Sequence, residues 1–455
     1  MRPAASTHAR AILLGSLAVA CLGCGENRAT DARPNVLLIT VDTLRADYLS
    51  SYGFAFETSP NIDALAREGV VFERAIAGAS ATTPSHASIM TSKYTRQHSV
   101  GWHNGDSKLQ GTSTLAEIFR WEGYATAAFV SNFMLRTGLG FEQGFELYDD
   151  ELTVPELNRP KIFERIAEQT TRRALDWLEG LDGGPFFLWV HYQDPHGPYA
   201  PPPGFEDRFQ LPPGPDEKAL PVLDDLDGYN GIPDYQALEG LNLPSQYKSR
   251  YADEIFYADQ WLGKLLAAVD SHERDAIVLF TSDHGESMVE HERYFVHGYT
   301  TTPGEAHVPM ILRAPGIAAG RRSASVSHVD VMPTLLELAG LDPAGTESGL
   351  ALGPFLRAQQ PIPERLVYCD IGFEVSAYSR DGFVRYIKAG GDGAQNPRWV
   401  SYAWQPGGAS SAVALDDTQR QTIETYLSKV TPIVKLPRLG QEDLEKLRAL
   451  GYVGH

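Results

Sequence analysis

The chain has 455 residues, of which 43% are hydrophobic. That is enough for one large α/β domain with a smaller companion, and it argues against global disorder. The formal net charge of −19 argues against a nucleic-acid-binding protein, because phosphate backbones need Lys and Arg for neutralisation. It does not exclude an anionic small substrate, since a local metal ion can hold an anion under an acidic surface.

The N-terminus has the parts of a secretory signal. Arg2 and Arg10 precede an apolar run at residues 11–22, and small residues follow it. The run is too short to span a bilayer. We therefore predict a signal peptide over residues 1–23 and export of the mature chain.

Cys24 directly follows Gly23 in a pattern that resembles a bacterial lipobox. We predict lipidation at Cys24, with Cys21 as the weaker candidate and ordinary signal cleavage as the alternative. The mature protein would be a lipoprotein on the periplasmic face or in the outer membrane, with residues 24–34 as a tether. Cys369 is the one cysteine left in the folded part, which excludes a disulfide framework and a thiolate metal cluster.

Four apolar runs read as buried strands, with helical patterns between them. Nearly continuous apolar segments suit strands covered on both faces, as in a parallel sheet. The alternation with helices predicts an α/β fold, a doubly wound and mostly parallel sheet flanked by helices, over residues 35–350. The predicted strands are residues 35–41, 124–130, 186–190 and 276–280, and the predicted helices are residues 61–68, 84–90, 113–121, 162–181, 246–269 and 330–338.

Two further segments differ in composition. Residues 200–245 are rich in Pro, Gly and Asp, which is typical of a long surface insertion or lid. In residues 351–455, short strand-like runs and a final charged helix at 441–450 predict a small C-terminal α+β subdomain.

Polar residues stand at the ends of the predicted strands. Asp42 follows the first strand, and Asp283 and His284 follow the fourth. In such sheets, ligands bind beyond the carboxyl ends of the strands. Carboxylates with an imidazole suit Mn or Zn, and Ca or Mg less well, so we predict that Asp42, Asp283 and His284 hold one divalent metal ion. Taken alone, Asp42 reads equally well as a turn residue, and His191 is better explained as a hydrogen-bonded core residue.

Residues 82–86 read Thr-Thr-Pro-Ser-His at the mouth of a predicted helix. Pro84 suits the first helical turn, so Thr82 lies at or just before the helix N-terminus. Free N–H groups and the positive end of the helix dipole favour an anion there. A hydroxyl beside a divalent cation can become a nucleophile. From the local sequence alone, simple capping by Thr is the preferred explanation.

Several ordered segments resemble the sulfatase family of the alkaline phosphatase superfamily. They include RPNVLLITVDTLRADYLSSYG, ATTPSHASIMTSKY, FFLWVHYQDPHGPY, TSDHGE and SHVDVMPTLLELAG, and the resemblance runs from about Arg33 to Leu341. It implies a large α/β domain with a smaller C-terminal sheet domain. It also implies a metal-bound nucleophile that attacks a sulfate or phosphate ester in line.

The resemblance assigns the metal ligands and the nucleophile. Asp42, Asp283 and His284 match metal-binding residues of the family, and Thr82 falls where the metal-bound nucleophile stands.

The resemblance also assigns residues that contact the substrate. His86 falls at the Arg of the sulfatase signature, and His196 matches the His of the family's D-P-H segment. His297 lies near a position where the family carries a Lys or His that faces the bound anion. We expect these three to hold substrate oxygens or to protonate the leaving group, and Lys93 is a weaker candidate for substrate binding.

Three residues depart from the sulfatase pattern. Known sulfatases carry a Cys or Ser that is converted to formylglycine, and Thr82 cannot follow that route because its Cβ bears a methyl group. Thr43 replaces a second Asp and His284 replaces an Asn, which favours Mn or Zn over Ca.

We therefore expect an exported, metal-dependent hydrolase that cleaves a sulfate or phosphate ester of a small molecule, glycan or lipid through a Thr nucleophile. A phosphodiesterase or a phospho-head-group transferase of the cell envelope is the alternative among enzymes. A catalytically silent binding lipoprotein is the alternative of another class. The expected partners are the ester substrate and the membrane, without nucleic acid.

Overall fold

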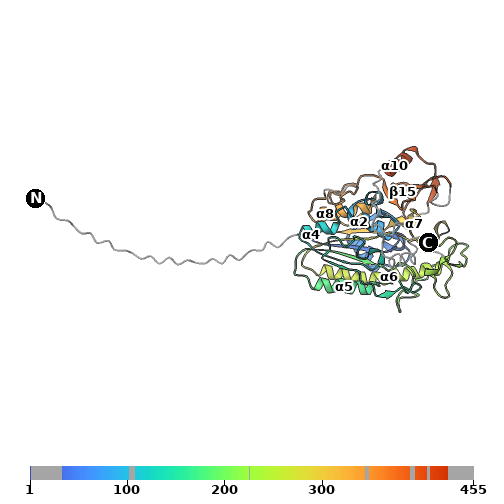
Figure 1. Ribbon diagram of the computed structural model, residues 1–455, viewed down its shortest axis with the longest axis horizontal. Coiled ribbons are helices and arrows are strands. Elements are labelled where there is room, and N and C mark those ends of the chain that lie inside the picture. Colours follow the sequence, from blue (N-terminus) through green and yellow to red (C-terminus); the bar gives the residue numbers. More distant parts are fainter. Residues whose placement is uncertain are drawn as a thin grey trace. The chain divides into compact units, whose positions relative to one another are not determined.

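The computed structural model describes residues 33–101, 108–224, 226–343, 348–389, 395–406 and 410–428 (Figure 1). The predicted signal peptide, Cys24 and the predicted helix at 441–450 lie outside these residues. Among the described residues, none of the helices combines the length and the apolar character that a membrane crossing needs.

The centre of the fold is a mixed sheet with the strand order β11-β2-β12-β10-β1-β7-β3-β4, and β13 pairs with β2. The pairs β10–β1, β1–β7, β7–β3, β3–β4 and β2–β13 are parallel, whereas β12 runs antiparallel to β10 and β2, and β11 runs antiparallel to β2. The strands are β1 (Asn35–Val41), β2 (Val70–Ile76), β3 (Ala125–Phe129), β4 (Leu147–Asp149), β7 (Phe186–Tyr192), β10 (Ala276–Ser282), β11 (His307–Val308), β12 (Met310–Arg313) and β13 (Gly320–Ser327). The predicted α/β fold is thus confirmed, with an antiparallel portion that the sequence pattern does not show.

Helices cover both faces of the sheet (Figure 1). The helices are α1 (Pro60–Glu68), α2 (Thr82–Thr91), α3 (Thr95–His98), α4 (Leu115–Trp121), α5 (Ala167–Glu179), α6 (Pro244–Asp270), α7 (Pro303–Ala306), α8 (Val331–Leu338), α9 (Gly353–Arg357) and α10 (Asp417–Ser428). Along β1, Val36 and Leu38 join the core under α2, α4 and α8, while Leu37 and Ile39 join the core under α1, α5 and α6. A strand that alternates between two cores must be apolar throughout, which explains the continuous apolar run.

Shorter elements surround this sheet. The small two-stranded sheets are β5 (Val154–Pro155) with β6 (Phe163–Glu164), and β8 (Val222–Leu223) with β9 (Ile232–Pro233). The short 3-10 helices are η1 (Ala46–Tyr48), η2 (Ser50–Tyr52), η3 (Phe133–Leu135), η4 (Asp234–Gln236), η5 (Glu290–Glu292) and η6 (His328–Asp330). The start of the predicted helix at 162–181 is instead β6, so α5 begins five residues later than expected.

The C-terminal part forms a separate antiparallel sheet of β14 (Val367–Asp370), β15 (Glu374–Tyr378), β16 (Gly382–Ile387), β17 (Arg398–Ala403) and β18 (Ser411–Val413). Helix α10 packs on it through Ile423, which joins Ala377 and Val384 in one apolar cluster. The predicted small C-terminal subdomain is therefore present.

Candidate active site

The site is at the carboxyl ends of neighbouring parallel strands. Strands β1 and β10 pair in register, with Val41 opposite Ser282, so the next residues, Asp42 and Asp283, leave the sheet side by side. This is the edge at which open α/β sheets bind ligands. Helix α2 begins at Thr82, and all ten of its residues are buried. A buried N-terminus places the free N–H groups of the first turn next to the strand ends.

Asp42, Asp283 and His284 offer ligand atoms that lie within 4.8 Å of one another. His284 Nε2 is 3.8 Å from Asp42 Oδ1 and 3.5 Å from Asp283 Oδ2. The Thr82 hydroxyl is the fourth member, with its Oγ1 at 3.4 Å from His284 Nε2. All four side chains are buried, so the structure brings together the predicted metal ligands and the predicted nucleophile.

Each metal-ligand candidate is anchored on one side and directed into the cluster on the other. Asp42 Oδ2 accepts from Asn132 Nδ2 at 2.7 Å, and Asp283 Oδ1 accepts from the backbone N–H of His284 at 2.7 Å. The opposite atoms, Asp42 Oδ1 and Asp283 Oδ2, have no hydrogen-bond partner within the part of the chain that the structure describes. His284 Nδ1–H donates to the Gly285 carbonyl at 2.8 Å, which leaves the lone pair on Nε2. Two buried carboxylate oxygens and an imidazole lone pair fit a divalent cation.

The pKa shifts of Asp283 and His284 also fit a site for a divalent cation. Burial and the neighbouring charge of Asp42 raise the pKa of Asp283, because two carboxylates cannot both ionise at low cost in a dry site. Burial lowers the pKa of His284 to about 3, so its imidazole is neutral at physiological pH and can act as a ligand.

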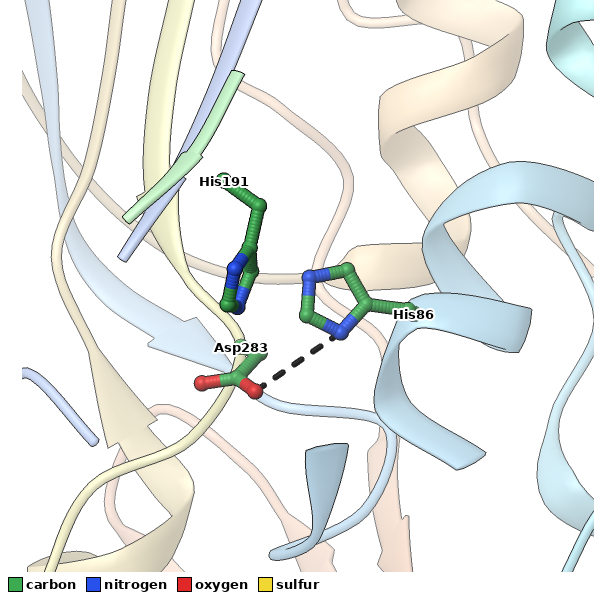
Figure 2. Close-up of side chains that lie close together, drawn as sticks. All are labelled: His86, His191 and Asp283. Carbon is green, nitrogen blue, oxygen red and sulfur yellow. Dashed lines mark ion pairs between the residues drawn. The ribbon is translucent and has the colours of Figure 1, made fainter. Parts of the chain in front are cut away.

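A second group, His86, His191 and Asp283, also lies within 4.8 Å (Figure 2). His86 Nδ1–H donates to the Thr82 carbonyl at 2.8 Å and lies 3.6 Å from Asp283 Oδ2, while its Nε2 accepts from the Thr40 hydroxyl at 3.1 Å. These partners assign the tautomer of His86 and occupy both of its nitrogens. The second group therefore does not fit a metal ion.

His191 lies beside the other carboxylate. Its Nδ1 accepts from the Ser131 N–H at 3.4 Å, which puts the ring proton on Nε2, 3.6 Å from Asp42 Oδ2. The His86 and His191 rings pack edge to face, with 5.0 Å between centroids. The expectation that His191 is a buried, hydrogen-bonded residue is confirmed: it bonds to Ser131, and its ring lies next to the site.

The position of His86 differs from the expectation that it contacts the substrate. It lies one turn into α2, behind Thr82 and Asp283, and both of its ring nitrogens bond to the protein. Lys93 also does not join the cluster. It follows the last turn of α2, about 15 Å along the helix from Thr82.

His196 and His297 lie beside the metal-ligand candidates. The His297 ring is 4.5 Å from that of His284 and 5.1 Å from that of His196, measured between centroids. His297 Nδ1 shares a hydrogen bond of 3.0 Å with Glu286 Oε1, and Tyr199 donates to the other oxygen of Glu286 at 3.1 Å. Burial lowers the pKa of both histidines, that of His297 to about 4.

Asn132 is a site residue that the sequence reasoning missed. It follows β3 by three residues, and its side chain holds Asp42 from one side and caps η3 from the other, where its Oδ1 accepts from the Met134 N–H at 2.7 Å. Applying the strand-end rule to the weaker run at 124–130 would have pointed to this residue.

A hollow opens beside His196 and His297. It contains about 600 Å³ of space, part of it open to solvent. Leu226 and Tyr235, from the segment predicted as an insertion or lid, contribute to its wall. Its other lining residues come from three places: the loop after β3, the β5–β6 segment, and the loops that carry the two histidines. They are Asn132, Phe133, Glu156, Arg159, Ile162, Phe163, Glu164, Gln193, Val296 and Tyr299.

A family model described as Sulfatase matches residues 34–341, which include every residue of the cluster. The chain belongs to the sulfatase family of the alkaline phosphatase superfamily. Among its relatives, an arylsulfatase of Clostridium perfringens is 28% identical over 376 residues, which cover 70% of this chain and 78% of the relative. A multifunctional alkaline phosphatase superfamily protein, PehA of Trinickia caryophylli, is 27% identical over 408 residues, which cover 72% of this chain and 78% of the relative.

Solved structures of family members share the fold. A phosphonate monoester hydrolase of Agrobacterium radiobacter superposes with a TM-score of 0.67 and 22% identity, covering 87% of this chain and 95% of that chain. A second phosphonate monoester hydrolase, from Silicibacter pomeroyi, superposes with a TM-score of 0.67 and 20% identity, covering 90% of this chain and 98% of that chain. The sulfatase family comprises metal-dependent hydrolases, and Asp42, Asp283 and His284 of this chain form a group that could hold a metal ion.

Proposed function

We propose that this sulfatase-family protein hydrolyses an ester of sulfate or phosphate with Thr82 as the nucleophile and one divalent metal ion. The position of the Thr82 hydroxyl carries the proposal: it is buried at the start of α2, 3.4 Å from His284 Nε2 and next to the carboxylates of Asp42 and Asp283. A bound cation would lower the pKa of the hydroxyl and neutralise charge on the substrate. Mn or Zn is the proposed ion, because the ligand set includes an imidazole.

Thr82 would act in two steps. Its hydroxyl gives up a proton and forms a bond to sulfur or phosphorus, while the bond from that atom to the leaving oxygen breaks and the leaving oxygen takes a proton. Water then attacks the Thr82 ester, which restores the hydroxyl and releases the acid. The N–H groups of the first turn of α2 favour the transferred anion in both steps.

His297 is proposed to move protons in these steps. Its bond to Glu286 fixes the ring, and Tyr199 fixes Glu286 in turn. An imidazole oriented by a carboxyl group is the usual arrangement of a general acid or base. His196 is proposed to hold a substrate oxygen, since its ring lies 5.1 Å from that of His297 and lines the hollow.

The side chain of Thr82 bears on the choice of substrate. A threonine cannot supply the formylglycine aldehyde, so its covalent ester must be broken at the transferred atom. Together with His284, this favours a phosphate diester, while family membership favours a sulfate ester. A transferase would differ only in replacing water by an acceptor hydroxyl in the second step. The buried cation-binding cluster argues against a silent binding protein.

The proposal is tested with metal-reconstituted protein on matched 4-nitrophenyl esters: a sulfate, a phosphate monoester and a phosphate diester. We expect Thr82→Ala to lower the rate on the preferred ester by at least about a thousandfold, since a removed nucleophile cannot be replaced by its neighbours. Thr83→Ala is the matched control, because the Thr83 hydroxyl bonds to the Met134 carbonyl, away from the cluster, and its rate should stay within a few-fold of wild type. Equal rates for the two variants would refute the nucleophile. No turnover of any ester by wild-type protein would favour the binding lipoprotein.

We also propose that the protein is exported and held at the membrane by a lipid on Cys24. The basic N-terminus, the apolar run and the cysteine after Gly23 support this proposal.

A further inference from the structure

The hollow beside the histidines contains a buried hydrogen-bond acceptor that lacks a donor. Gln193 is 7% exposed, and its Oε1 has no hydrogen-bond partner among the described residues. Glu164, whose side chain is half-buried, lines the same hollow. A buried acceptor that lacks a donor costs free energy, which a ligand with N–H groups would recover.

The positive charge in this hollow is already matched. Arg159 donates from Nε and Nη2 to the two carboxylate oxygens of Glu156, and its guanidinium stacks on the Tyr235 ring at 4.1 Å. Arg159 also acts on Glu164, but it is shared with Glu156, so the two acids of the hollow outnumber this cation and leave an excess of acidic character. An anionic organic group would meet that excess, whereas a cationic group would be attracted to it.

The remaining wall suits a small alkyl group that carries such a cation. Ile162, Phe163 and Val296 supply apolar surface, and ammonium groups bind well beside an aromatic ring such as that of Phe163. The Phe133 ring already carries the Arg136 guanidinium, at 4.0 Å. Burial and the nearby Glu156 and Asp194 raise the pKa of Glu164 although Arg159 lowers it, so a bound ligand cation would favour the ionised form of Glu164.

We propose that the organic group of the substrate carries an ammonium ion, which binds to Glu164 and Gln193 while the sulfate or phosphate group lies at the Thr82 cluster. The inference rests on the proposed function, because it needs the anion to bind at the metal-ligand candidates. It assigns Glu164 and Gln193 as residues that determine substrate specificity.

The test compares two ligands that the enzyme cannot hydrolyse and that differ only at the end of the chain. Binding of 2-aminoethylphosphonate and propylphosphonate to manganese-loaded protein is measured by titration calorimetry. We expect the aminoethyl compound to bind about tenfold to a hundredfold more tightly, as charge-assisted hydrogen bonds provide in a buried site. Equal affinities would overturn the inference and leave the proposed function standing. Failure of both ligands to bind would overturn both.

Three variants show which residues produce the difference in affinity between the two ligands. Glu164→Gln should bring the affinity ratio close to one, and Gln193→Met, which is similar in size and uncharged, should lower it by several-fold. Glu179→Gln, on the exposed end of α5, should keep the wild-type ratio. Melting temperatures check that each variant is folded. If Glu164→Gln is unstable, Gln193→Met decides the question, and an unchanged ratio in it would overturn the inference.

The ammonium group could belong to a soluble ester or to a lipid. Displacement of 2-aminoethylphosphonate by soluble glycerophosphoethanolamine alone would assign a small-molecule ester, and displacement by micellar lysophosphatidylethanolamine alone would assign a lipid. Displacement by neither compound would overturn the inference for ethanolamine-type substrates.

Discussion

The substitution Asp283→Asn tests two effects of the buried carboxylate pair: repulsion between the carboxylates in the metal-free protein, and binding of the metal ion. In the metal-free protein, Asp283 lies beside Asp42 with one oxygen unpaired among the described residues, and the charge of Asp42 raises its pKa. The amide removes this repulsion, so the metal-free variant should be as stable as wild type or more stable, by about 1–3 kcal/mol. The same change removes a metal ligand.

The measurement is the melting temperature after chelation and after addition of manganese. At a free-ion concentration a thousandfold above Kd, binding stabilises the folded state by about 4 kcal/mol. For a chain of this length, that corresponds to a shift of about 4 °C, since 1 kcal/mol moves the midpoint by roughly 1 °C. Wild type should show this shift and Asp283→Asn should not.

Asp275→Asn is the matched control, because Asp275 is exposed just before the other end of β10. It should keep the wild-type shift. A full manganese shift in Asp283→Asn would refute the assignment of the cluster as a metal site. A loss of metal-free stability larger than about 3 kcal/mol would refute the argument that the two carboxylates repel.

Three further outcomes are expected. His86→Arg, which restores the residue of the sulfatase signature, should lower the free energy of unfolding in urea by about 1–3 kcal/mol. His86 is fully buried against Trp189 and His191, so a larger side chain overpacks the site. A variant as stable as wild type, or more stable, would refute this argument. Arg45 overcomes the effect of burial and lowers the pKa of Glu290 to about 2, so Glu290 should stabilise the fold above pH 4.5 and lose that contribution as the pH falls through 2. Because the Glu290 side chain is about a third exposed, Glu290→Gln should cost only about 1 kcal/mol at neutral pH, and a difference from wild type that does not shrink in acid would count against the ion pair. Cys24→Ser should move the mature chain from the detergent phase to the aqueous phase in Triton X-114 partition, and an unchanged distribution would exclude lipidation at Cys24.

The metal-ligand candidates could be predicted because their positions depend on local rules. A buried strand in a parallel sheet is apolar along its length, and its end is marked by the first charged residue. Asp42 and Asp283 both satisfy this rule, and the in-register pairing of β1 with β10 then places them side by side. Pro84 marked the start of the helix only approximately: α2 begins two residues earlier, at Thr82, with Ala81 as its N-cap and no side-chain cap. The nucleophile role of Thr82 came from the family resemblance, because the local sequence alone favoured capping.

The surroundings of other predicted site residues depend on contacts between distant segments, which the sequence pattern does not show. His86 was assigned by its place in a motif, but its orientation is fixed by Thr40 on β1 and by the Thr82 carbonyl. Lys93 is close to Thr82 in sequence, yet a ten-residue helix separates them. The hollow combines β5–β6, η3 and the segment at 200–245, and its composition cannot be read from any one of them.

The two buried imidazoles suggest why this chain can do without the arginine of the sulfatase signature. His191 directs its Nε2–H toward Asp42 Oδ2 at 3.6 Å, on the side away from the Asp42 Oδ1 that faces His284. The His86 ring packs 3.6 Å from Asp283 Oδ2, while its Nδ1–H donates to the Thr82 carbonyl. Asn132 and backbone N–H groups hold the same carboxylates from other directions. Each carboxylate therefore keeps one oxygen directed at His284 Nε2 and the Thr82 hydroxyl. Ligands that are held in this way need little rearrangement to bind a cation, so the protein supplies the geometry before the metal arrives.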